Sequence, residues 1–307
     1  PGGTSSGSGV AVSARIAPLG VGEDSAGSIR IPSAWTGIVG FKPSSGRYVN
    51  TGIVPLAPHR DTPGPMVRTI DDAILIDSLV TGSPLDLPPA GLEGLRIGLM
   101  PSYWNIVDPE ANKVLQGVLA RLEELGVVFV RENIPDLNQI IAANFLTDML
   151  CSGFDAINDY LLEHELGFDF YHVRDNVVTP AVAGVMALAT PGVISEESCE
   201  QSLSETRPEV QRLYAQYFTQ HNVDALILPS IVFPAPLIGE QTVIIDGEPY
   251  ETLNWGIRNV EPAAFAGLPS LTIPVGLTES EQLPVGLLID GPAGEDRRVL
   301  AIGKAIE

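Results

Sequence analysis

Two glycine-rich loops open the sequence, Pro1-Gly-Gly-Thr-Ser-Ser-Gly-Ser-Gly9 and Gly22-Glu-Asp-Ser-Ala-Gly-Ser-Ile-Arg-Ile-Pro32. Between them lies Val10-Ala-Val-Ser-Ala-Arg-Ile-Ala-Pro-Leu-Gly20, a stretch of mostly small and apolar residues. We expect this stretch to form a short buried helix that brings its flanking loops close together. Because glycine lets the backbone approach other atoms closely and serine supplies hydroxyl groups, two such loops around one helix are typical of a catalytic pocket.

The two loops resemble the signature of the amidase signature family without a gap from Gly2 to Pro32. The resemblance continues in short elements farther along the chain: Gly40-Phe-Lys-Pro43, Gly46-Arg47, Asp61-Thr-Pro-Gly-Pro65, Arg68-Thr69, Gly267-Leu-Pro269, Leu283-Pro-Val-Gly286 and Gly294-Glu-Asp296. Two segments are most similar to the indoleacetamide and mandelamide hydrolase branch, Phe41-Lys-Pro-Ser-Ser-Gly-Arg-Tyr48 and Arg258-Asn-Val-Glu-Pro262. The resemblance implies an amide hydrolase with an α/β fold, a mixed sheet covered by helices on both faces.

The resemblance also assigns the catalytic hydroxyls. Ser28 matches the nucleophile of a Ser–bridging hydroxyl–Lys triad, which would form an acyl-enzyme. The bridging hydroxyl falls on Thr4, where the family has serine, and Ser5 is the alternative for that role. Threonine has the same hydrogen-bonding capacity as serine, but its methyl group restricts χ1 and crowds a proton relay.

The residues next to Ser28 match the family's supporting groups. The N–H groups of Ser25, Ala26 and Gly27 match the oxyanion hole, where small residues leave the backbone donors accessible. We expect Asp24 and Arg30 to hold the loop in shape through buried hydrogen bonds.

The family's general-base lysine precedes the first glycine loop, so we expect it upstream of residue 1, in a segment missing from an N-terminally incomplete domain. Of the three lysines present, Lys42 matches a structural lysine of the family and is the alternative base. A base is needed because a serine hydroxyl is a poor nucleophile until its proton is removed.

Other interpretations of the same residues have less support. Gly3-Thr-Ser-Ser-Gly7 fits the nucleophile elbow of α/β-hydrolases, but none of the four histidines lies in a recognisable partner context. A phosphate-binding loop would need Gly-Lys-Ser/Thr, which does not occur. The acidic surroundings of His164 and His172 follow no standard metal-ligand spacing. An ordinary linker is disfavoured because Asp24, Ser28, Arg30 and Pro32 are in register with the signature.

The amino-acid composition limits the kinds of partner that we expect the protein to bind. A net charge of −21 disfavours binding to a nucleic-acid backbone. The sequence has no run of eighteen apolar residues, so we expect no membrane span. Cys151 and Cys199 are far apart and are expected to be free packing residues in a reducing compartment. We therefore expect a cytoplasmic enzyme without metal or cofactor that acts on a small-molecule amide or carbamate. The sequence is compatible with a homodimer.

The rest of the chain predicts one α/β domain over residues 1–307. It would contain a signature core over 1–82 and a mainly helical substrate-pocket region over about 140–220. Periodicity predicts helices over 70–80 and 109–125, the latter capped by Asp108, and strands at 95–100, 127–130, 225–229, 270–274 and 285–289. The function predicted is hydrolysis of a small or aryl carboxamide, anilide or carbamate. The alternatives are an ammonia-delivering A-type subunit of an amidotransferase complex and a catalytically inactive family member.

Overall fold

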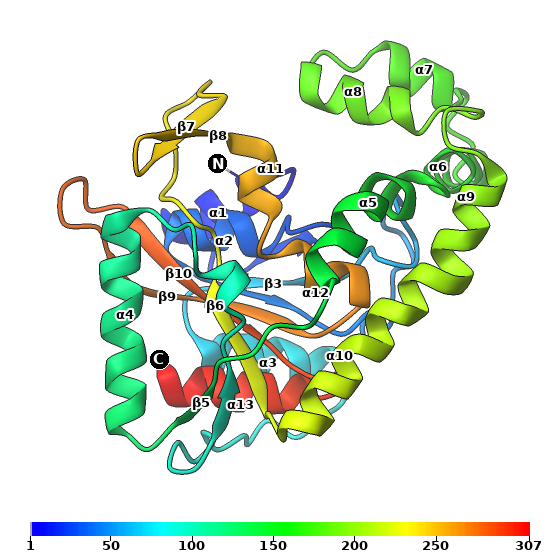
Figure 1. Ribbon diagram of the computed structural model, residues 1–307. Coiled ribbons are helices and arrows are strands. Elements are labelled where there is room, and N and C mark those ends of the chain that lie inside the picture. The colour runs from blue at the N-terminus through cyan, green and yellow to red at the C-terminus, as the bar shows by residue number, and fades with distance from the viewer. Residues whose placement is uncertain (1) are drawn as a thin grey trace.

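The protein folds as one mixed β-sheet with helices on both faces, as the sequence predicts (Figure 1). The computed structural model describes residues 2–307. The sheet has eight strands in the order β1-β3-β2-β9-β10-β6-β4-β5. Its first six strands pair antiparallel, whereas β6, β4 and β5 pair parallel. A separate hairpin is formed by β7 and β8.

The strands run as follows: β1 Gly20–Glu23, β2 Val39–Lys42, β3 Pro63–Val67, β4 Arg96–Gly98, β5 Val128–Val130, β6 Ala225–Pro229, β7 Thr242–Ile245, β8 Glu248–Glu251, β9 Ser270–Leu277 and β10 Pro284–Asp290. The helices are α1 Ser6–Ser13, α2 Arg30–Thr36, α3 Ile70–Thr81, η1 Pro101–Tyr103, α4 Pro109–Glu124, α5 Leu137–Leu150, α6 Gly153–Glu163, α7 Phe170–Asp175, α8 Pro180–Leu188, α9 Glu196–Gln201, η2 Ser202–Thr206, α10 Arg207–His221, α11 Thr252–Ile257, α12 Glu261–Ala266 and α13 Asp296–Ile306.

The strand–helix–strand unit predicted around α4 is confirmed. Asp108 caps α4 by accepting from the N–H groups of Glu110 and Ala111, and Pro109 occupies the first helical position. β4 and β5 on either side of this helix pair in parallel. The predicted helix at 70–80 and the predicted strands correspond to α3, β4, β5, β6, β9 and β10.

The prediction of a buried helix between the two glycine loops is partly wrong. The helix there, α1, begins earlier, at Ser6, and ends at Ser13, and only Gly9 and Val12 are buried. The chain must turn after it because Gly20 already pairs with Met66 in the sheet. Arg15, with φ 60°, lies in this turn.

The short helix α2 packs unusually close to the sheet because small residues lie beneath it. A Cβ atom on Gly40 of β2 would approach Ser33 Oγ to 2.2 Å, and one on Gly286 of β10 would approach Ala34 Cβ to 2.8 Å. The close approach fixes the start of α2, and with it the loop that carries Ser28. On the opposite face, α13 packs on Leu271, where a Cβ on Gly303 would clash.

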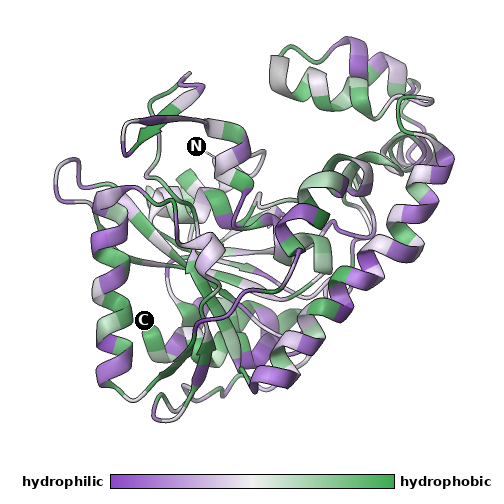
Figure 2. Cartoon of the chain, in the orientation of Figure 1, coloured by the Kyte–Doolittle hydropathy of each residue, from purple (hydrophilic) through white to green (hydrophobic). Residues whose placement is uncertain are grey.

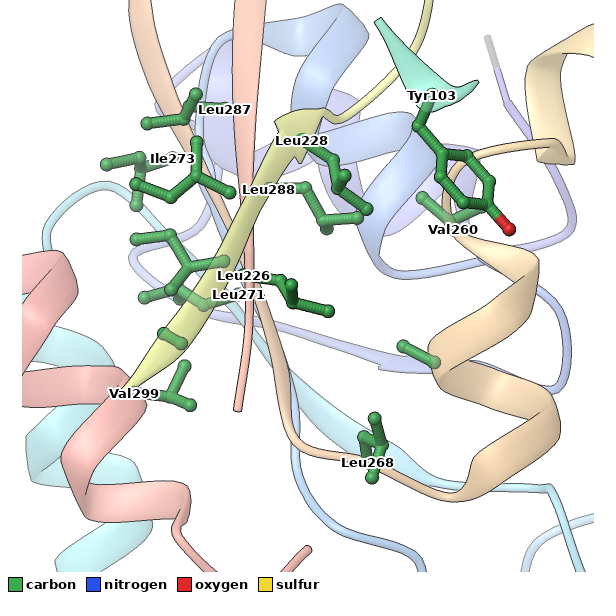
Figure 3. Packing of buried hydrophobic residues seen from close by; sticks show 14 of the residues in the cluster. Tyr103, Leu226, Leu228, Val260, Leu268, Leu271, Ile273, Leu287, Leu288 and Val299 are labelled. Atoms are coloured by element: carbon green, nitrogen blue, oxygen red, sulfur yellow. The ribbon is translucent and has the colours of Figure 1, made fainter. Parts of the chain in front are cut away.

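The hydrophobic core lies on both sides of the central strands. Figure 3 shows Leu226, Leu228 and Leu288 on one side of the sheet and Ile273 and Leu287 on the other, as alternation along each strand requires. The outer helices are amphipathic, with hydrophilic residues toward solvent, as α4 and α10 show in Figure 2. The central strands are therefore rigidly held, and they anchor the loops at their ends.

The region predicted to be helical, residues 140–220, contains α5 to α10 and extends from the sheet (Figure 1). Within it, Leu137–Glu163 is long and apolar enough to cross a membrane by length and composition, with a mean hydropathy of 1.3. The structure divides this segment into α5 and α6 at Cys151 and Ser152. Asp148 within it lies in a buried ion pair with Arg60. These contacts are those of two helices packed on the domain.

Candidate active site

The two glycine loops meet at Ser28. The Cα of Gly3 lies so close to Ser28 that a Cβ atom there would be 2.9 Å from Ser28 Oγ. Gly2 packs on Ile31 and Trp35 of α2, where a Cβ would clash at 2.5 Å with Ile31. Both glycines have positive φ, 83° and 86°. The first loop therefore needs glycine for its conformation and for its contact with Ser28.

Ser28 itself is half-buried between β1 and α2. Among the described residues, no protein group forms a hydrogen bond with its Oγ. A hydroxyl that is neither fully buried nor hydrogen-bonded is available to a substrate.

Asp24 organises the loop that carries Ser28. Its carboxylate accepts from the N–H groups of Gly27 at 2.7 Å, Ile29 at 3.1 Å and Arg30 at 3.4 Å. It also pairs with the Arg30 guanidinium at 2.8 and 3.0 Å. Burial alone would raise the pKa of Asp24, but the charge and hydrogen bonds of Arg30 hold it below its ordinary value. Arg30 in turn donates to Val260 O, which joins the loop to the segment before α12.

The backbone donors near Ser28 differ from the prediction at one position. The N–H of Gly27 is bonded to Asp24, so it is not free for an oxyanion. Within residues 2–307, the N–H groups of Ser25, Ala26 and Ser28 form no hydrogen bond with protein. Position 27 requires glycine for another reason. Its φ is 123°, and a Cβ there would lie 2.5 Å from Val260 Cγ2.

The two candidate bridging hydroxyls have different surroundings. Thr4 is exposed, and its hydroxyl forms no hydrogen bond with any described residue. Ser5 Oγ is bound to the backbone of Glu23, accepting from its N–H at 3.2 Å and donating to its carbonyl at 3.4 Å. Ser5 thus fastens the first loop to β1. Neither hydroxyl is hydrogen-bonded to Ser28.

The lysines in the described part of the chain do not contact Ser28. Lys42 is fully buried, and its Nζ donates to the carbonyls of Pro43 and Leu268 at 3.0 Å each. Burial, with the nearby charge of Arg30, lowers the pKa of Lys42 to about 7. Lys113 pairs with Glu279, and Lys304 pairs with Asp71. Lys42 therefore has the contacts of a structural lysine.

A cluster of buried charged side chains also supports the loop that carries Ser28. Periodicity and composition gave no indication of this cluster. Arg60 Nε donates to Ser25 O at 2.9 Å. Its other nitrogens bind Asp148 at 3.1 Å and Glu261 at 2.6 and 2.7 Å. Burial raises the pKa of Glu261 to about 7, although Arg60 opposes this effect. Glu261 lies in a motif that carried the family resemblance, and Arg60 directly precedes another, which was the only signal in the sequence for these two residues.

The Ser25 side chain lies between two carboxyl groups. Its Oγ is 2.7 Å from Asp61 Oδ1 and 3.0 Å from Glu23 Oε1. Burial, followed by the charges of Asp61 and Asp24, raises the pKa of Glu23 to about 8. Asp61 also accepts from the N–H groups of Leu56 and Ala57, which fixes the chain beside Ala26.

The open side of the loop faces an apolar cluster from the helical region. Ala26 and Leu56 pack against a set of residues on α5, α6, α7 and α8 with its own small core: Met149, Leu150, Ile157, Leu161, Phe170, Met186 and Ala189. The loop that carries Ser28 therefore borders an apolar surface at Ala26. A groove of about 910 Å³ also lies along α10 and the start of α13, but its lining contains no residue of the two glycine loops.

The histidines do not complete an alternative site. His59 Nε2 lies 3.4 Å from Asp148, His164 stacks on Tyr160, and His221 packs on Tyr217. No contact joins a described histidine to Ser5 or Ser28. Nor do residues 2–307 contain a group of three or more His, Cys, Asp or Glu that could hold a metal ion.

The sequence matches the family model described as Amidase over residues 1–300, which includes both loops. The chain belongs to the amidase signature family. It is 36% identical over its whole length to an indoleacetamide hydrolase of Rhizobium radiobacter and 34% identical to a mandelamide hydrolase of Pseudomonas putida. It spans 66% and 61% of the length of these two relatives. A crystal structure of an amidase, 27% identical, superposes with a TM-score of 0.80 over 98% of this chain and 64% of the other.

Proposed function

We propose that this amidase hydrolyses a small carboxamide, with an apolar or aryl acyl group, through an acyl-enzyme on Ser28. The observation that carries the proposal is the Ser28 hydroxyl itself, half-buried and unbonded at the point where the two glycine loops meet. The apolar cluster beside Ala26 favours an apolar acyl group. The relatives are named for indoleacetamide and mandelamide, two carboxamides that carry an aromatic ring.

The groups of the loop that carries Ser28 suggest how the amide bond would be hydrolysed. Ser28 Oγ attacks the amide carbonyl carbon, and its proton leaves through the bridging hydroxyl of Thr4 toward a lysine base, which the family resemblance implies. The carbonyl oxygen becomes an oxyanion that the free N–H groups of Ala26 and Ser28 bind; one such donor is worth about 2.7–4 kcal/mol in a well-studied protease. The relayed proton goes to the leaving nitrogen as the C–N bond breaks. Water then hydrolyses the ester through the same groups. A carbamate or anilide would react in the same way.

The experiment is covalent labelling of the intact protein with a fluorophosphonate. We expect a single adduct on the peptide containing Gly27, Ser28 and Ile29, and no adduct in Ser28→Ala. Release of ammonia from an arylacetamide should disappear in the same variant. A label on Ser5 with Ser28 unmodified would instead support the nucleophile elbow.

Two further outcomes separate the alternatives. Ammonia release that required a second protein subunit would support the amidotransferase-subunit alternative. A correctly folded protein that neither hydrolyses arylacetamides nor accepts the label would support an inactive family member.

A further inference from the structure

The two cysteines, 48 positions apart in the sequence, come together in the structure. Cys151 directly follows the last residue of α5, and Cys199 lies in α9. These two helices contact each other, and the thiol of Cys199 lies near enough to that of Cys151 to raise its pKa. Both thiols are free and half-buried. The expectation that both cysteines are free is confirmed, but the helical region folds back on itself and brings these two distant positions together.

A second contact fixes the geometry of this pair. Ser202 Oγ donates to Asp148 Oδ1 at 3.4 Å, which also joins the α5 segment to the segment after α9. Asp148 precedes Cys151 by three residues, and Ser202 follows Cys199 by three. Residues three apart share a helix face. The two segments therefore run antiparallel here, and the face carrying Asp148 and Cys151 is opposed by the face carrying Ser202 and Cys199.

We propose that Cys151 and Cys199 form a reversible disulfide that ties the end of α5 to α9. The oxidant is a small disulfide such as oxidised glutathione. One of the two cysteine thiolates attacks the glutathione disulfide, forms a mixed disulfide and releases one glutathione thiolate. The sulfur of the other cysteine then displaces the second glutathione. Both thiol protons leave to water, and two electrons pass to glutathione.

The position of this disulfide gives it a mechanical consequence. Asp148, one helical turn before Cys151, binds Arg60, and Arg60 holds the Ser25 carbonyl in the loop next to Ser28. The α9 segment continues through η2, a π-helical turn, into α10. Such turns occur frequently at functional sites. The cross-link would restrain α5 against α9 and so stiffen the support of this loop.

The test is oxidation of the folded, intact protein with oxidised glutathione, followed by thiol titration and mass spectrometry without reduction. We expect both thiols to be lost, a decrease of about 2 Da for one disulfide, and a cross-linked peptide pair that contains Cys151 and Cys199. Dithiothreitol should restore both thiols. The readout does not depend on catalytic activity.

Matched variants keep the test decisive. Cys151→Ser and Cys199→Ser should each take up one glutathione and form no internal disulfide. Cys199→Ser combined with Glu200→Cys moves the thiol by about 100° around the helix, so we expect it to lose the internal disulfide as well. Two glutathiones on the parent protein, or an internal disulfide formed equally well by the Glu200→Cys variant, would overturn the proposal.

Discussion

At the scale of single residues, Thr4 and Ser5 are adjacent hydroxyls with different surroundings. Ser5 is bound to both backbone groups of Glu23, whereas Thr4 has no hydrogen-bond partner among the described residues. We infer from this difference that Thr4 is the better candidate for the bridging role, because a hydroxyl already bonded to a strand edge is poorly placed to relay a proton.

The corresponding prediction uses Thr4→Ala and Ser5→Ala in the intact protein. Thr4→Ala should lower kcat by about 10²–10⁴-fold with little change in stability, because proton relay by a positioned group has that magnitude. Thr4→Ser should keep most activity. Ser5→Ala should mainly lower the melting temperature, because it removes the bond to β1. A severe loss of kcat in Ser5→Ala with a mild one in Thr4→Ala would reverse the assignment.

Glu23 gives a pH prediction at the same scale. The folded protein holds its pKa near 8, against an ordinary value of 4.5, so the folded state keeps a proton that the unfolded chain has lost. Stability should therefore fall as the pH rises from about 4.5 to about 8, by at most about 1.4 kcal/mol per pH unit for one group. Glu261 and Asp290, whose pKa values are raised to about 7 and about 6, act in the same direction.

Urea denaturation at several pH values between about 5 and about 8 measures this slope. Glu23→Gln should reduce the slope without abolishing it, because the amide oxygen still accepts from Ser25 Oγ and the side chain cannot ionise. An unchanged slope in the variant would show that Glu23 is not the group that titrates.

At the scale of elements, the sequence predicts the regular parts of the sheet better than the part that builds the site. Helices α3 and α4 and the apolar strands β6, β9 and β10 have clear periodicity or apolar runs. Strands β1, β2 and β3 were missed because they contain glycine or proline, as in Pro63-Gly-Pro-Met-Val67. The structure explains these residues by close packing: a Cβ on Gly64 would lie 2.1 Å from Phe41 O.

The buried charged residues that support the loop could not be predicted, because their partners lie far away in the sequence. Arg60 is 88 residues from Asp148 and 201 from Glu261, so only the folded chain brings them together. The resemblance did identify Asp24 and Arg30 as residues that hold the loop, because they lie in one contiguous motif. It assigned Gly27 as an oxyanion donor, whereas Asp24 takes that N–H.

Arg60 provides the prediction for this scale. Arg60→Met would leave the Glu261 carboxyl group buried without its ion-pair partner and Asp148 with only its longer contacts to Arg207 and His59. Loss of one member of a buried ion pair costs about 3–5 kcal/mol. Adding Asp148→Asn and Glu261→Gln to Arg60→Met should recover part of this loss. The matched control is Arg212→Met, which breaks the exposed pair with Glu209 and should leave the free energy of unfolding nearly unchanged. Equal losses in the two single arginine variants would contradict a special role for the buried cluster.

At the scale of the whole molecule, charge is the dominant feature. The chain carries a net charge of −21, and among the described residues the fold buries more acidic than basic side chains. The exposed surface nevertheless keeps most of this negative charge. Self-repulsion of such a surface destabilises the compact state, and mobile ions screen it.

We therefore expect the melting temperature to rise with sodium chloride, most steeply below about 0.2 M, where the Debye length shortens from about 30 Å at 0.01 M toward about 8 Å. The buried pairs, such as Arg30 with Asp24, are shielded from solvent and should not weaken over this range. Repulsion between surface charges depends on ionic strength and not on the kind of anion, so chloride and perchlorate should act alike at these concentrations. The internal control is pH: near the isoelectric point of 4.4 the net charge vanishes, and the same salt series should leave the melting temperature almost constant. An equal rise at both pH values, or one that depended on the anion, would mean that the salt acts through hydration of the surface, and the acidic surface would then cost the fold little.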